Sequence, residues 1–295
     1  MFASLPDSAR VRVKPSLARD LLGAAERLPR YENREFYSSQ LQSMINEALR
    51  KETDGFDSLI AEIEAGLQRR PYCVLVQGLS FDEGNKVFVG LNRAFGELVA
   101  RPYEAPRAQL VHYIQPATDL PSVRGGQESE RLHTDTADWE PPVELISMVC
   151  VRADPAGGGR SRVLDVDSIR EEVSDQLGPK VLKTLETERV PWQLASYCGG
   201  GVRWRCILTK SSVCWRRYTI DLALDSTAAK PSAEMFSALE AFETVVSTTP
   251  RTIEFLMCEG DLLFSDNRRT IHARTPISSG LTSERLMIRS WVRRA

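Results

Sequence analysis

The chain has 295 residues, of which 42% are hydrophobic and 26% charged, and it carries a formal net charge of −2 at pH 7. This composition is ordinary for a soluble globular protein, and the charge gives no general reason to expect nucleic acid or another polyanion as a partner. The sequence has no run of about 18 apolar residues that would span a membrane, and its start, MFASLPDSARVRVKPS, lacks the continuous apolar core of a signal peptide. We therefore expect a cytoplasmic enzyme or binding protein without a membrane partner.

The first hundred residues are predicted to be mainly helical. Apolar residues recur at spacings of three and four, the period of an amphipathic helix, in residues 15–28, 40–51 and 56–70. A short buried strand, YCVLVQGL, follows at 72–79, and residues 85–100 return to helical spacing. The segment QLVHYIQP at 109–116 is predicted as a strand that ends at its proline.

Beyond residue 143 the chain is rich in strand-forming segments. Runs of β-branched and aromatic residues predict strands at 143–153, 161–166, 202–209, 213–224, 252–266 and 285–292. Two segments with helical spacing, 168–186 and 232–246, interrupt these strands. No Gly/Ser or Pro linker of the kind that marks a domain boundary lies between them.

These elements predict a mainly β protein with flanking helices. Because the strands are too many for a small sheet, we expect a single domain over 1–295, a β-sandwich of the jelly-roll (double-stranded β-helix, cupin-like) type with helices packed outside it. Residues 1–108 would form a mainly helical part and 109–295 the jelly-roll core. The segment RGGQESER at 124–131 is too polar for the core and is a candidate lid.

The cysteines do not indicate a disulfide framework. None of them forms a C-x-x-C pair, and several lie in apolar segments with strand character. We therefore expect reduced, mostly buried thiols at Cys73, Cys150, Cys198, Cys206, Cys214 and Cys258.

One short motif, HTD at 133–135, combines two metal-binding residue types in a chain with only three histidines. Side chains two residues apart in an extended segment point to one side, with Cα atoms roughly 7 Å apart, so His133 and Asp135 can converge on one ion. An imidazole and a carboxylate suit iron, manganese or zinc, with a third ligand from elsewhere in the chain. For the pair alone, the alternative is a surface histidine beside an N-cap aspartate.

The remaining histidines, His112 and His272, are the histidine candidates for the third ligand. His272 begins an extended piece after the polar, arginine-rich turn of GDLLFSDNRRTIHARTPI. His112 lies in the middle of the predicted strand LVHYIQ, where a partly buried structural histidine is the commoner role. We favour His272.

Together these motifs resemble the taurine dioxygenase and clavaminate synthase-like family of iron(II)- and 2-oxoglutarate-dependent oxygenases. The resemblance covers about residues 109–293, and the pair DNRRTIHART and ERLMIRSWV, similar to the family's C-terminal signature, is its most specific part. It implies that His133, Asp135 and His272 bind Fe(II), with 2-oxoglutarate and O2 on the opposite face of the metal. Two positions differ from the residues that are common in the family: Leu132 before the first histidine and Ala273 after the distal one. Neither difference affects the three ligands.

The resemblance also implies roles around the cosubstrate. Arg285 matches the family's arginine that binds the distal carboxylate of 2-oxoglutarate, and a planar guanidinium suits such a carboxylate. Ser161 in GGGRS matches a hydroxyl residue that helps to bind the same group, although the glycines can also form only a tight loop. Arg289 matches an arginine that in some relatives binds an acidic group of the prime substrate. A structural salt bridge is the alternative for Arg289.

The expected function is oxidation, by default hydroxylation, of an unactivated C–H bond in a small polar or anionic metabolite, with release of succinate and CO2. An amino acid or a natural-product intermediate is the expected kind of substrate. Two alternatives stay open: a zinc hydrolase in which the three ligands polarise a water, and a non-catalytic cupin-like binding protein. The zinc alternative leaves Arg285 and Ser161 unexplained.

Overall fold

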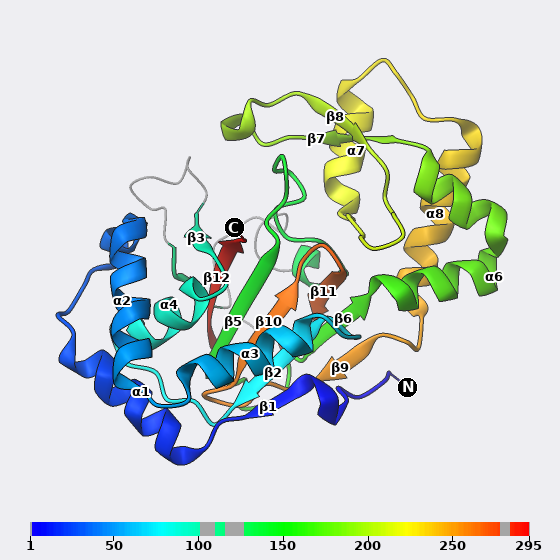
Figure 1. Ribbon diagram of the computed structural model, residues 1–295. Helices are drawn as coiled ribbons and strands as arrows, with labels where there is room; N and C mark the ends of the chain where they lie inside the picture. The colour runs from blue at the N-terminus through cyan, green and yellow to red at the C-terminus, as the bar shows by residue number, and fades with distance from the viewer. Residues whose placement is uncertain (1, 101–109, 116–126, 278–283, 295) are drawn as a thin grey trace.

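The computed structural model describes residues 2–100, 110–115, 127–277 and 284–294, and its centre is formed by two facing β-sheets (Figure 1). The larger, seven-stranded sheet has the order β1-β2-β10-β5-β12-β3, with β4 also paired to β12. Its strands are β1 (Arg10–Arg12), β2 (Cys73–Gln77), β3 (Glu97–Val99), β4 (His112–Ile114), β5 (Leu145–Arg152), β10 (Leu262–Asp266) and β12 (Leu286–Arg293). The smaller sheet has the order β11-β6-β9, from β6 (Ser161–Asp165), β9 (Ile253–Phe255) and β11 (Thr270–Arg274).

Side chains of the larger sheet alternate between its two faces, as a period of two requires. In β10, Leu262 and Phe264 belong to the core beneath the helices, whereas Leu263 and Ser265 line a cavity between the sheets. Strand β12 alternates in the same way, and its residues of odd number, Met287 and Arg289, line that cavity. The alternation therefore gives the sheet one apolar face for the helices and one face for a site.

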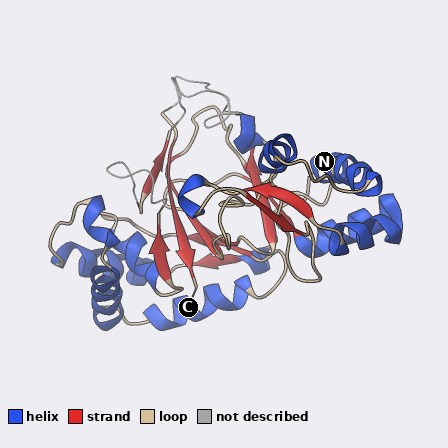
Figure 2. Ribbon diagram, turned by 90° about the horizontal axis from the view of Figure 1, so that it is seen from above, coloured by secondary structure: helices blue, strands red, loops and turns tan. Residues whose placement is uncertain are grey.

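Four helices from the first hundred residues cover the outer face of the larger sheet (Figures 1 and 2): α1 (Pro15–Arg27), α2 (Ser39–Glu52), α3 (Phe56–Leu67) and α4 (Lys86–Arg93). The three helices predicted within residues 15–70 are present. The helix predicted over 85–100 ends at Arg93, because Gly96 adopts a positive φ of 151° and the chain then pairs as β3 with β12. The same part of the chain thus also supplies β1, β2 and β3 to the sheet, and the division at residue 108 stays a prediction.

The smaller sheet is covered by α6 (Val166–Thr187), α7 (Arg217–Ser226) and α8 (Ala233–Thr248), beside the hairpin of β7 (Val190–Gln193) and β8 (Val202–Arg205). The strand predicted over 213–224 is wrong, because most of this segment forms α7. Its β-branched and aromatic residues resemble a strand, yet Ile220 and Ala223 are buried at helical spacing. Arg217 also pairs with Asp221 one turn later, with Nε and Oδ1 2.7 Å apart.

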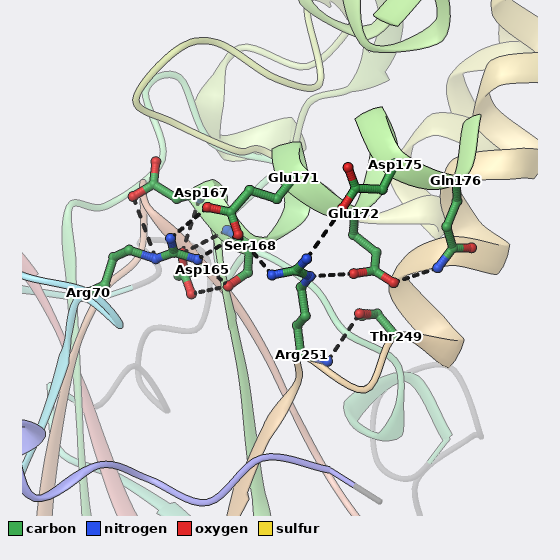
Figure 3. Close-up of polar contacts among 10 residues, drawn as sticks. All are labelled: Arg70, Asp165, Asp167, Ser168, Glu171, Glu172, Asp175, Gln176, Thr249 and Arg251. Carbon is green, nitrogen blue, oxygen red and sulfur yellow. Dashed lines mark hydrogen bonds and ion pairs between the residues drawn. The ribbon is translucent and has the colours of Figure 1, made fainter. Parts of the chain in front are cut away.

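An ionic network at the start of α6 connects the two sheets (Figure 3). Arg70, just before β2, contacts the carboxylates of Asp165 and Glu171 at 3.2 and 2.7 Å. Arg251, just before β9, contacts Glu171 at 2.9 Å and two further carboxylates of α6, those of Glu172 and Asp175. Since Asp165 ends β6 and also caps α6 through its side chain, the network holds the end of a strand that lines the cavity.

The six cysteines, all within the described residues, are free thiols, but the prediction that they are mostly buried is wrong. Only Cys73 and Cys150 are buried, while Cys198, Cys206 and Cys214 are half-buried and Cys258 is exposed. Burial raises the pKa of the Cys73 thiol to about 12. None of the helices in the described part of the chain is long and apolar enough to cross a membrane.

Candidate metal centre

The two histidines of the candidate centre are brought together by main-chain pairing. His133 and His272 form an isolated antiparallel bridge in which each N–H donates to the other residue's carbonyl oxygen at 2.9 Å. His272 lies at the centre of β11, opposite Val163 of β6. The ring centroids of the two imidazoles are 4.6 Å apart, so the pairing of two segments distant in sequence sets the separation of the rings.

Asp135 completes a group of three metal-binding side chains. Its Oδ1 lies 3.6 Å from Nε2 of His133 and 4.0 Å from Nε2 of His272. One potential ligand atom from each residue lies within 4.8 Å of the others, and within the described ranges no other group of three or more His, Cys, Asp or Glu side chains meets this condition. The structure therefore brings together the three residues that the sequence singles out, at a spacing that a metal ion can bridge.

The main chain of Asp135 is held on both sides. Asn267, fully buried, accepts from the N–H of Asp135 at 3.0 Å and donates to its carbonyl at 2.9 Å. The next residue, Thr136, has a left-handed φ of 52°, which is strained for a β-branched side chain. Its hydroxyl accepts from the N–H of Val143 at 2.9 Å. These contacts turn the chain immediately after Asp135 and fix where its carboxylate points.

The state of the histidine nitrogens suits a cation. Nδ1 of His133 lies 2.8 Å from the carbonyl oxygen of Arg131, so in a neutral ring it donates this bond and leaves the Nε2 lone pair facing Asp135. Burial lowers the pKa of His272 to about 3, which keeps this imidazole neutral. The lone pair on Nε2 of the neutral His133 ring thus faces the Asp135 carboxylate beside the neutral His272 ring, and a bound divalent metal offsets the repulsion between this lone pair and the carboxylate.

The carboxylate of Asp135 is only 2% exposed but stays ionised. Burial alone would raise its pKa, yet the positive charge of Arg289 holds the pKa of Asp135 well below its usual range. Nη1 of Arg289 lies 3.0 Å from Oδ2, and the indole N–H of Trp291 donates to the same oxygen at 2.8 Å. An anionic ligand is therefore available at neutral pH.

A cavity between the sheets adjoins the three side chains, and His133 and His272 form part of its wall. The rest of the wall is mostly apolar, with contributions from Ile114, Ile146, Met148, Val163, Leu263 and Met287. Four arginines also reach the wall: Arg162 from β6, Arg274 from β11, Arg285 directly before β12, and Arg289 from β12. Such a cavity fits a small molecule that carries at least one carboxylate.

Arg285 and Ser161 both line this cavity, as their predicted roles require. Arg285 directly precedes β12, is 6% exposed, and donates from Nη2 to the carbonyl oxygen of Gly159 at 3.4 Å. Burial and the nearby guanidinium of Arg274 lower the pKa of Arg285. An anion bound beside Arg274 and Arg285 would offset both the burial of the Arg285 charge and its repulsion from Arg274. Ser161 begins β6, opposite Arg274 of β11.

The other residues considered from the sequence lie as follows. His112 is outside the metal group; its ring packs against Trp291 with centroids 4.6 Å apart. Arg289 lines the cavity and also contacts Asp135, so its role toward a prime substrate stays a prediction.

Of the candidate lid, residues 124–126 lie outside the described residues, while 127–130 form a short 3-10 helix whose Glu130 pairs with Arg274 at 3.1 Å.

Three contributors to the site were not found from the sequence: Asn267, Trp291 and Arg274. Asn267 lies within the motif DNRRTIHART, but no local pattern in the sequence marks its contact with Asp135. Trp291, Arg285 and Arg289 are all odd-numbered residues of one extended segment, so their side chains are expected on the same side of the sheet. This alternation could have indicated that Trp291 points inward. Arg274 shares a strand face with His272, two residues away.

Comparisons with known proteins show the family and the fold. The model of a family described as "Taurine catabolism dioxygenase TauD, TfdA family" matches residues 48–291. A search of curated proteins finds no match.

Several solved structures share the fold. Asparagine oxygenase is 15% identical, with 97% of this chain and 93% of that chain covered and a TM-score of 0.77. Its complex with Fe(II), 2S,3S-3-hydroxyasparagine and succinate has 17% identity, the same coverage and a TM-score of 0.74. The non-heme iron oxygenase OrfP with Fe and alpha-ketoglutaric acid is 16% identical over 99% of this chain and 94% of that chain, with a TM-score of 0.74. The predicted mainly β fold with flanking helices is confirmed.

Proposed function

The chain belongs to the taurine catabolism dioxygenase TauD, TfdA family and is an oxidoreductase; on this basis we propose that it uses Fe(II), 2-oxoglutarate and O2 to hydroxylate a small substrate of amino-acid type in the cytoplasm. The observation that carries the proposal is the convergence of His133, Asp135 and His272 at the wall of a cavity that also contains the buried Arg285. Neither the three metal-binding side chains alone nor the buried Arg285 alone points to 2-oxoglutarate as the cosubstrate.

Different residues of the chain have different roles in the proposed reaction. His133, Asp135 and His272 hold the metal, which when bound supplies the redox chemistry that couples decarboxylation of 2-oxoglutarate to oxidation of a C–H bond. Arg285 binds the distal carboxylate of 2-oxoglutarate through its planar guanidinium, and the Ser161 hydroxyl donates to the same group. The apolar wall keeps water from the reacting atoms.

The substrate class rests on two supports. The cavity has cationic groups as well as apolar walls, which favours a compact molecule with a carboxylate. The solved structures of similar fold include an asparagine oxygenase and an oxygenase in complex with (3S)-hydroxy-L-Arg. A free amino acid or a close derivative is therefore the substrate that we propose.

Substrate-stimulated succinate release tests this function. The purified protein, supplied with Fe(II), 2-oxoglutarate and O2, should form succinate faster in the presence of at least one member of a panel of free amino acids and derivatives. The product should gain one oxygen atom from O2, which mass spectrometry with labelled O2 detects. Zinc-dependent hydrolysis without 2-oxoglutarate consumption would establish the rival enzyme class, and ligand binding without turnover of any kind would favour a cupin-like binding protein.

The backbone at Gly159 gives a further prediction about 2-oxoglutarate binding. A Cβ added to Gly159 would lie 2.6 Å from Nε of Arg285, and Gly159 has a positive φ of 65°. We expect Gly159→Ala to displace the guanidinium and to weaken 2-oxoglutarate binding by about 10- to 100-fold. Calorimetric titration of 2-oxoglutarate into the Co(II)-loaded protein measures this.

Gly157 provides the matched control for that substitution. It has a similar φ of 75°, but a Cβ added there meets no atom within 4 Å. Gly157→Ala therefore introduces the same kind of backbone strain without touching Arg285, and its affinity should stay near that of the unmodified protein. Equal losses in both variants would mean that loop strain, not the position of Arg285, determines the affinity.

A further inference from the structure

The two oxygens of the Asp135 carboxylate have different surroundings. Oδ2 accepts from Nη1 of Arg289 at 3.0 Å and from the indole N–H of Trp291 at 2.8 Å. Oδ1 accepts a longer hydrogen bond from the same Nη1 of Arg289 at 3.4 Å and faces the Nε2 atoms of both histidines. The two shorter hydrogen bonds therefore go to Oδ2, and Oδ1, with only the longer one, is directed toward the metal position.

Both donors come from one face of β12 and are held rigidly. Arg289 and Trp291 are two residues apart in the strand, and the guanidinium carbon of Arg289 lies 4.6 Å from the centroid of the Trp291 ring. Trp291 is 1% exposed and also packs against the rings of His112 and Trp139, with centroids 4.6 and 5.7 Å away. Its indole N–H therefore cannot turn away from Asp135 without repacking this cluster.

We propose that Arg289 and Trp291 are positioning residues that restrict Asp135 to binding the metal through Oδ1 alone. Their hydrogen bonds make Oδ2 a poor second ligand, and the guanidinium offsets the negative charge of a buried carboxylate when no metal is bound. One coordination position that a two-oxygen carboxylate would take is thereby kept for cosubstrate or O2. This inference rests on the proposed metal site and gives Arg289 a role toward the metal ligand Asp135.

The main test removes the indole N–H and keeps an aromatic ring. Trp291→Phe should weaken Co(II) binding about 10- to 100-fold, the range typical for loss of a partner behind a metal ligand. It should also change the visible absorption of bound Co(II), which reports how the ligands surround the metal. Both are measured on full-length protein without 2-oxoglutarate, by calorimetric titration and absorption spectroscopy.

Trp139→Phe is the matched control. Trp139 is 6% exposed and belongs to the same aromatic cluster, but its indole N–H contacts the hydroxyl of Tyr197 instead of Asp135. It should lower the melting temperature as any loss of packing does, with Co(II) affinity and spectrum unchanged. Equal effects of the two tryptophan substitutions on Co(II) binding would overturn the proposal, since they would reflect packing alone.

Arg289→Gln gives an independent second test, which also decides the matter if Trp291→Phe fails to fold. We expect a loss of Co(II) affinity of at least about tenfold before any substrate is added. If Co(II) affinity were unchanged and only the apparent constant for the prime substrate rose, Arg289 would be a substrate residue and the inference would be wrong.

Failure of this inference and failure of the proposed function would give different results. A wild-type protein that binds Co(II) but releases no succinate would contradict the proposed reaction and leave this test intact. Active enzyme whose Trp291→Phe and Arg289→Gln variants both bind Co(II) normally would contradict this inference only.

Discussion

Replacement of His272 by alanine is expected to reduce 2-oxoglutarate turnover to the background of the assay. Among the residues that the structure describes, the imidazole is one of three side chains whose ligand atoms converge at the site. Partners behind a ligand are already worth about 10- to 100-fold in metal affinity, so loss of a ligand itself should cost more than about 100-fold. Succinate formation at saturating Fe(II) measures the activity, and Co(II) titration measures the affinity. Asp135→Ala and His133→Ala should behave in the same way.

The fold should survive this change, and a matched histidine tests the assignment. The bridge between residues 133 and 272 is made by main-chain atoms, so His272→Ala leaves both of its hydrogen bonds in place. Circular dichroism and the melting temperature should therefore stay close to those of the unmodified protein. His112→Phe keeps a ring against Trp291 and should keep its activity. An active His272→Ala together with an inactive His112→Phe would mean that His112 is the third ligand.

The parts of the fold that the sequence predicts well are those with a strong local period. The helices at 15–27 and 39–52, and the strands at 145–152 and 286–293, have apolar residues at the spacing of their own element and are buried along one face or both. Segment 213–224 fails because Val213, Trp215 and Ile220 suit a strand by composition. Their burial in one apolar cluster with residues of β7, α6 and α8 decides the outcome, and this packing depends on distant residues.

The three metal-binding side chains could be chosen from the sequence because histidine is rare in this chain, which left few combinations. The arrangement behind them could not be chosen in the same way. Asn267 clamps Asp135 from a position 132 residues away, a pairing that no local pattern reveals. Arg289 could be placed on the cavity wall by strand parity, but only the structure shows its guanidinium against Asp135. Local pattern thus predicts the ligands, while tertiary contacts determine how they are held.

Arg285→Ala is expected to weaken 2-oxoglutarate binding by a factor of hundreds or more. The guanidinium is 6% exposed, and removing one partner of a buried, hydrogen-bonded ion pair costs roughly 3 to 5 kcal/mol. Arg285→Lys should recover only part of this loss, because an ammonium keeps the charge but cannot bind both carboxylate oxygens in a planar fork. Calorimetric titration of 2-oxoglutarate into Co(II)-loaded protein measures the affinity without knowledge of the prime substrate.

Arg162 supplies the control that separates a specific contact from general loss of positive charge. It also lines the cavity, but its Nε contacts the carboxylate of Glu254 at 2.9 Å, so its charge already has an acidic partner. Arg162→Ala removes the same formal charge from the same wall and should change 2-oxoglutarate affinity by less than about threefold, since a screened, partly exposed charge contributes little at this range. Similar losses for Arg162→Ala and Arg285→Ala would show that the cavity attracts 2-oxoglutarate through its overall field. A large loss confined to Arg285→Ala, with Co(II) affinity unchanged, would place the distal carboxylate at this guanidinium.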